Sequence, residues 1–225
     1  MTVTTVYATA PGGVGKVHST HSVYASARTG ASPSVTSLFS PSDKHVVGQD
    51  ASNGYRCFES FLIFDTSGLP DTDNIDDVVL SLDGNVDWST TDFNVIAAPS
   101  DYDGGPVVVG DWISGADLAA TTTLASWNSS GYSATYNAFT SVAAFLTAIN
   151  KTGNTPIILY SDRHSDGTAP TDLERVEFTD ADASGTTTDP KLDITHAAGG
   201  GGAAGYLVDS PLVNSSLLVG GRLLR

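Results

Sequence analysis

The chain has 225 residues, enough for one larger domain or one domain with appendages, and its formal net charge is −15. Such an acidic surface argues against nucleic acid and against an anionic membrane as partners, because both are bound through Lys and Arg. Only three of the 25 acidic residues are Glu, and the chain holds 23 Gly. Because Asp and Gly favour turns, this composition predicts an all-β protein with many turns.

The first motif is GGVGK, residues 12–16, which resembles a phosphate-binding loop. Such a loop needs a hydroxyl residue after the Lys and a helix behind it. Val17 follows Lys16, and the next residues favour an extended chain. We therefore interpret the motif as a glycine-rich turn between two strands.

Strands are predicted in the first half of the chain at residues 2–8, 17–27, 34–39, 44–48, 55–65, 76–86 and 92–99. The strongest is 55–65, which is rich in aromatic residues and contains Cys57. Because Cys57 is the single cysteine, no intramolecular disulfide can form, and a buried structural thiol is expected.

The second half is less regular from 100 to 137, with a short helix predicted at 114–121. A better helix is predicted at 141–150, where Val142, Phe145, Leu146 and Ile149 follow helical spacing and Thr140 or Ser141 can cap it. Strands follow at 155–161, 173–180 and 190–196. The pattern predicts a jelly-roll-like antiparallel β-sandwich with one short helix, about 140–150, and an extended C-terminal arm.

The predicted domain organisation is a β-sandwich at 1–196, a Gly/Ala linker at 197–205 and an anchoring arm at 206–225. Alternatively, residues 1–49 form a separate N-terminal attachment element. The arm carries short apolar groups about every five residues and a positive end, and we predict that it mediates assembly through Leu207, Val208, Leu212, Val213, Leu217, Leu218, Val219, Leu223, Leu224, Arg222 and Arg225.

The segment YRCFESFLIFDTSGLPDTDNIDDVVLSLDG, residues 55–84, resembles the signature of DNRLRE-type or carbohydrate-binding-like β-sandwich modules. The matching residues are Arg56, Phe61, 64–67 (Phe-Asp-Thr-Ser), Leu69, Pro70, Ile75 and the strand 78–82. With the helix and strands that follow, the resemblance covers roughly residues 50–196. It implies a β-sandwich of the kind found in secreted cell-surface proteins and bacteriophage virion proteins, as an adhesive or structural unit. The Asp65 carboxylate is expected to accept hydrogen bonds from N–H groups of the turn after it.

No motif singles out a catalytic pair of carboxylates, and Glu174 and Glu177 are expected on opposite faces of one strand. We therefore predict that the chain is not an enzyme. Arg56 and Arg175 are expected to pair with buried acids.

Two kinds of binding site remain as candidates. Asp71, Asp73, Asp76 and Asp77 form an acidic turn that offers oxygen ligands for structural calcium, although solvated turn residues are the simpler interpretation. No other cofactor is expected. Trp88, Trp112 and Trp127 are the candidates for contact with a glycan.

The first ten residues lack the basic and apolar regions of a signal peptide, so we expect the chain to be made in the cytosol. The leading hypothesis is a bacteriophage virion structural protein, a capsid decoration protein or a tail or fibre component, assembled in the host cytoplasm. Its partners would be other virion proteins and further copies of itself, a trimer being one arrangement. The alternative is a carbohydrate-binding module that adheres to a host surface.

Overall fold

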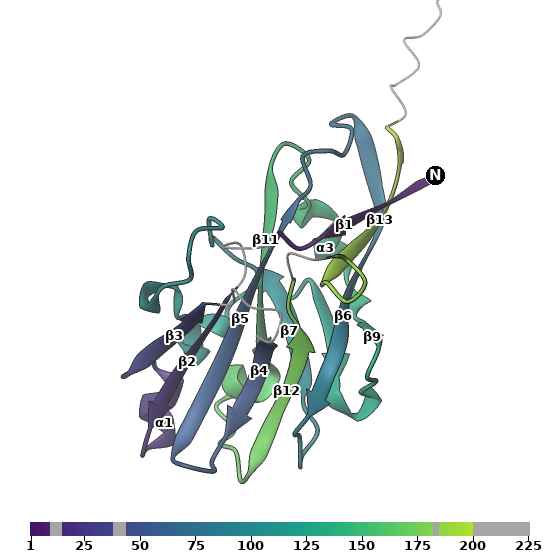
Figure 1. The fold of residues 1–225 in the computed structure, drawn as a ribbon. Helices are drawn as coiled ribbons and strands as arrows, with labels where there is room; N and C mark the ends of the chain where they lie inside the picture. The colour runs from purple at the N-terminus through teal and green to yellow at the C-terminus, as the bar shows by residue number, and fades with distance from the viewer. Residues whose placement is uncertain (10–14, 38–43, 182–184, 200–225) are drawn as a thin grey trace, which may run out of the picture.

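The structure is a computed structural model that describes residues 1–9, 15–37, 44–181 and 185–199 (Figure 1). The strands are β1 (Thr2–Tyr7), β2 (Gly15–His21), β3 (Pro33–Ser37), β4 (Lys44–Asp50), β5 (Tyr55–Asp65), β6 (Asp73–Asp87), β7 (Asn94–Pro99), β8 (Ala125–Asn128), β9 (Tyr136–Ala138), β10 (Thr140–Ser141), β11 (Asn154–Ser161), β12 (Leu173–Thr179) and β13 (Lys191–Ala198). The helices are α1 (Tyr24–Arg28), α2 (Gly115–Leu118), α3 (Ala143–Ala148) and α4 (Asp162–Asp166), with 3-10 turns η1 (Val109–Asp111) and η2 (Ser129–Gly131).

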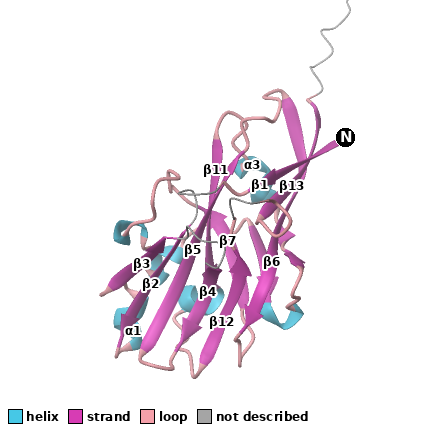
Figure 2. Cartoon of the chain, in the orientation of Figure 1, coloured by secondary structure: helices cyan, strands magenta, loops and turns pink. Residues whose placement is uncertain are grey.

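The described strands form one 13-stranded sheet whose main path runs β1-β13-β6-β12-β4-β5-β11-β7-β8-β10. All pairs along this path are antiparallel. Strands β2 and β3 extend from the other edge of β5, and β9 pairs with β6. The all-β prediction is confirmed: Figure 2 shows a curled sheet with a few short helices. Among the described residues, no helix has the length and apolar character needed to cross a membrane.

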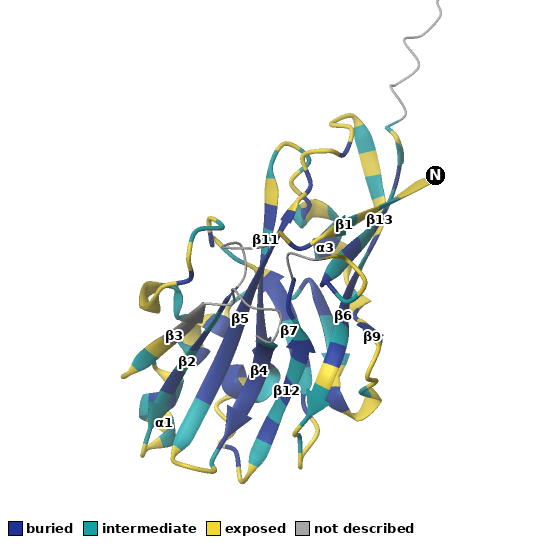
Figure 3. Cartoon of the chain, viewed as in Figure 1, coloured by how far each residue is buried: buried dark blue, intermediate teal, exposed yellow. Residues whose placement is uncertain are grey.

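The main hydrophobic core lies inside the curl of the sheet, and every long strand of the path contributes to it (Figure 3). Alternate residues of the strands point inward, as the period of two requires. The largest side chains in this core are fully buried and include Phe64, Leu80, Phe145, Ile157 and Phe178. Strands far apart in sequence are thereby held together by one apolar interior.

Strands β5 and β11 are buried on both faces. Leu62 and Phe64 point into the main core, whereas Phe61 and Ile63 point into a second core outside the curl. That second core is covered by residues 100–121, which bring in Tyr102 and Val107. Double burial explains why residues 61–64 are all apolar, and the bounds predicted for the strand at 55–65 are confirmed.

The described strands among the first 49 residues belong to the same sheet. β1 pairs with β13, β2 pairs with β5, and β4 pairs with both β5 and β12. The structure therefore places the described part of this region within the β domain and not in a separate attachment element. Gly15 and Lys16 begin strand β2, so an extended chain follows the glycine motif, as predicted.

The strand predicted at 17–27 is wrong beyond His21, because α1 follows it. Ala27 of this helix is buried, and the Tyr24 hydroxyl donates to Gln49 Oε1 at 2.9 Å. These long-range contacts outweigh the β-propensity of the segment.

The helix predicted at 141–150 is present but spans only Ala143–Ala148. Ser141 does not cap it, because this residue belongs to β10 and its hydroxyl donates to the Val78 carbonyl. The short helix predicted at 114–121 is present as α2, with Ser114 as its N-cap. Helix α4 was not predicted, although Ser161 caps its start and Gly167 adopts φ +76° at its end.

Candidate functional site

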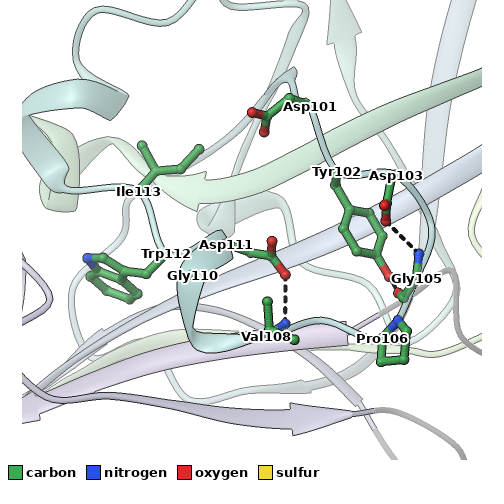
Figure 4. A pocket seen from close by; sticks show the side chains of 10 residues that line it. All are labelled: Asp101, Tyr102, Asp103, Gly105, Pro106, Val108, Gly110, Asp111, Trp112 and Ile113. Atoms are coloured by element: carbon green, nitrogen blue, oxygen red, sulfur yellow. Dashed lines mark hydrogen bonds between the residues drawn. The ribbon is translucent and has the colours of Figure 1, made fainter.

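A cleft of about 520 Å³ lies in the loop that covers the second core (Figure 4). The loop runs from the end of β7 to the start of α2 and includes η1. The residues that line the cleft are Asp101, Tyr102, Asp103, Gly105, Pro106, Val108, Gly110, Asp111, Trp112 and Ile113. Because one side of this loop packs on β5 and β11, a rigid sheet supports the cleft.

Hydrogen bonds within the loop fix the shape of the cleft. The Tyr102 ring packs on Phe61 with 5.4 Å between ring centroids, and its hydroxyl donates to the Gly105 carbonyl. Asp103 Oδ1 accepts from the Gly105 N–H at 2.9 Å, and Asp111 Oδ2 accepts from the Val108 N–H at 2.7 Å. These short-range contacts orient the acidic side chains before any ligand arrives.

The charge of the cleft is negative. Asp101, Asp103 and Asp111 line it, and no Lys or Arg does so in the described part of the chain. Burial, together with the charges of Asp111 and Asp103, raises the pKa of Tyr102 to about 12, so its hydroxyl stays neutral. The cleft therefore suits a neutral polyol or a cation and disfavours an anionic ligand.

Trp112 is the predicted tryptophan that lines the cleft. It is half-buried, and its ring lies 5.3 Å from that of His164. A Cβ atom on Gly30 would lie 2.3 Å from the indole, so only glycine fits beside it. The indole is thus held between two parts of the domain and forms a fixed apolar wall.

The other two predicted tryptophans lie elsewhere. Trp127, on β8, is half-buried and packs in the main core against Phe139 and Phe178, at 6.0 and 5.7 Å between ring centroids. Trp88 follows β6 and is 43% exposed. The structure therefore separates the three residues into a cleft wall, a core side chain and a surface side chain.

The four aspartates of the acidic turn have separate surroundings in the structure. No group of three or more His, Cys, Asp or Glu in the described residues is arranged to hold a metal ion. Asp73 Oδ2 lies 2.7 Å from His196 Nδ1, and the Lys151 ammonium donates to the carbonyls of Asp71 and Asp73 at 2.6 Å. Asp76 and Asp77 are exposed residues of β6. The arrangement therefore does not support the calcium prediction.

His196 instead links three strands. Its Nε2 atom lies 2.9 Å from the Thr4 hydroxyl of β1, while Nδ1 contacts Asp73 of β6. The ring itself belongs to β13 and is almost fully buried. These contacts tie the edge strand β1 to the interior of the sheet.

The predicted assembly arm lies outside the described residues, which end at Gly199. The placement of its eleven candidate residues is therefore still a prediction from the sequence.

The predicted pairing of Arg56 and Arg175 with a buried acid is confirmed. Both guanidinium groups contact Asp50 Oδ2, at 2.8 and 3.4 Å, and Asp50 is fully buried. Both also lie over the Phe58 ring, at 5.6 and 5.7 Å from its centroid.

Cys57 is buried as expected, and its burial raises the pKa of the thiol, so it remains protonated. The Asp65 turn also forms as predicted, because Asp65 Oδ1 accepts from the Ser67 N–H at 3.1 Å.

A buried polar pair lies next to the cleft. Glu59 Oε2 accepts from the Ile113 N–H at 3.1 Å, and Glu59 Oε1 lies 3.8 Å from His164 Nδ1. Burial raises the pKa of Glu59 well above its usual value and lowers the pKa of His164 to about 4. Because both shifts favour the neutral forms, we interpret this contact as one between neutral groups.

The Glu59→Gln variant is expected to gain stability relative to the wild type as the pH rises from about 5 to about 8. The raised pKa means that folded wild-type protein holds a proton that the unfolded chain releases, so its stability falls with rising pH. The amide introduced by the substitution would stay neutral and keep an acceptor for the Ile113 N–H. Urea denaturation across this pH range measures the effect, and parallel profiles for the two proteins would contradict it.

The acidic residues of the cleft were not identified from the sequence. The string DYDGGP, residues 101–106, marks a turn by its Asp and Gly content, but only the fold shows that Asp111 lies beside it. Neither the protein-family models nor the curated proteins compared with this sequence give a match. The resemblance of residues 55–84 to DNRLRE-type modules therefore stays a prediction from that motif.

Proposed function

We propose that this chain is a bacteriophage virion structural protein, a capsid decoration protein or a tail or fibre component, with a binding and not a catalytic role. The β domain would sit outermost, and residues 206–225 would join it to neighbouring proteins, including further copies of the same chain. The observation that carries this proposal is that the sheet and the main core of the β domain are complete at strand β13, before the arm begins.

Strand β13 completes both the sheet and the main core. Both of its edges are paired, with β1 on one side and β6 on the other, and Leu192 and Ile194 complete the main core. Gly199 makes the last described contact, an N–H donated to the Thr72 carbonyl at 3.1 Å. The described fold thus contains its own core, and we propose that the apolar groups of residues 206–225 bind a partner surface.

Incorporation into particles tests this proposal. The chain would be produced together with the other structural proteins of its genome, and the particles purified by sedimentation. Wild-type chain is expected to co-sediment, and a full-length variant carrying Leu217→Asp and Leu218→Asp is expected to stay in the soluble fraction. A variant that folds normally and incorporates as well as the wild type would contradict the role of the arm.

A second function, glycan binding, is favoured by the cleft at residues 101–113. Sugars are commonly held by an aromatic wall and by carboxylates that accept their hydroxyl hydrogens, and the cleft offers Trp112 with three aspartates. Its negative charge favours neutral sugars or amino sugars over sialic and uronic acids. A virion surface domain can carry both functions.

The Trp112→Ala variant is expected to weaken glycan binding about tenfold, because it removes the aromatic wall. Glycan arrays would identify the ligand, and titration calorimetry would measure its affinity. Trp88→Ala is the matched control, since Trp88 is exposed and lies outside the lining of the cleft. Equal losses in the two variants, or no loss in either, would contradict the assignment of this cleft.

A further inference from the structure

We propose that the groove between β6 and α3 is the receptor for the C-terminal arm, residues 206–225, of a neighbouring copy. This inference rests on the proposed function and names the surface that the arm would bind. The groove is lined by Asp73, Asn74, Ile75, Asp76, Ala143, Leu146, Thr147, Ile149 and Lys151. It lies where the first part of β6 passes α3, near the end of the curled sheet at which β13 ends (Figure 1).

The floor of the groove is apolar because the main core is not fully covered there. Ile75 and Leu146 pack against that core, yet both are only half-buried. On the same helical stretch Val142, which precedes α3, is 43% exposed, whereas Phe145 is fully buried. The helix thus carries more apolar surface than the core of its own domain covers.

The residue types of the arm complement this surface, because they offer apolar side chains for its floor and cations for its rim. Its Leu and Val groups could cover the apolar floor, and Arg222 and Arg225 are its two cations in a chain of net charge −15. The rim of the groove presents Asp76, which is exposed and forms no ion pair within the described ranges. Apolar contact with a charged rim is the usual composition of a specific protein interface.

The position of the last described residues also supports binding of the arm in this groove. Ala198 pairs with Asp73, and Gly199 donates its N–H to the Thr72 carbonyl, so the last described residues lie beside the groove. The Gly/Ala linker to residue 206 can span about 20 Å. A neighbouring copy packed at this end can therefore place its arm in the groove, and exchange of arms would join copies symmetrically.

The test compares full-length variants by light scattering. Asp76→Lys reverses an exposed charge at little risk to the fold, and Leu146→Glu places a charge on the apolar floor. Both are expected to reduce the wild-type oligomer to the monomer mass, as is the arm variant with Leu217→Asp and Leu218→Asp. Val3→Glu is the matched control, because Val3 is 63% exposed and is not a groove residue; it is expected to keep the oligomer.

Exchange between copies is tested by mixing two full-length variants, one with Thr147→Cys and one with Leu218→Cys. A disulfide-linked pair of chains is expected after mild oxidation. Absence of that link, or groove variants that keep the wild-type mass while the arm variant loses it, would overturn the receptor assignment and leave the proposed function standing. If the arm variant also keeps the wild-type mass, the proposed assembly role of the arm fails with it.

Discussion

Replacing Phe178 by alanine is expected to lower the free energy of unfolding by about 3–5 kcal/mol. Phe178 is fully buried on β12, where it contacts Trp127 and Phe139, whose ring centroids lie 5.7 and 6.4 Å from its own. The smaller side chain would leave a cavity that the surrounding strands cannot fill, since each is fixed by two neighbours in the sheet.

Urea denaturation followed by tryptophan fluorescence measures this loss, because Trp127 borders the site. The control is Phe178→Leu, which keeps most of the apolar volume and is expected to cost less than half as much. If both variants lose the same small amount, the packing described for this core is wrong.

Glu174→Ala is expected to cost about 3 kcal/mol, because it removes one member of a buried ion pair. Arg163 binds both oxygens of Glu174, at 2.7 and 3.1 Å, and Gln49 Nε2 donates to Oε2 at 3.0 Å. Glu174 is fully buried, so its loss leaves a guanidinium and an amide without their acceptor. The Arg163 side chain is 23% exposed, and solvent access keeps the cost at the low end of the range for buried pairs.

Glu177→Ala is the matched control on the same strand. Glu177 points to the opposite face, as the sequence spacing predicts, and its described contact is a 3.4 Å hydrogen bond from Asn85. Its loss is expected to cost less than about 1 kcal/mol. Equal costs for the two substitutions would show that the Arg163–Glu174 pair does not stabilise α4 against β12.

The strands were predictable where burial is regular. In β5, and in β6 from Val78 to Leu82, the pattern of apolar residues follows the faces of the sheet, and the predicted segments match. Between residues 100 and 141 the helix α2 was predicted, but the short strands β8, β9 and β10 were not, because they are set by pairing with distant segments. In such segments local propensity is weaker than tertiary contact.

The candidate cleft could be predicted only in part. Residue type identifies Trp112 and Trp127 equally, yet one lines the cleft and the other packs in the core. Their difference depends on which face of the sheet each segment covers, and sequence spacing does not reveal that. Likewise, the turn at Asp71 offers carboxylates, but Lys151 and His196 bind there through contacts that are distant in sequence.

The native mass of the full-length chain, measured by light scattering beside the Leu217→Asp, Leu218→Asp variant, tests the central claim most directly. A defined oligomer is expected for the wild type and a folded monomer for the variant. Two folded proteins of the same mass would contradict the claim that residues 206–225 assemble this chain.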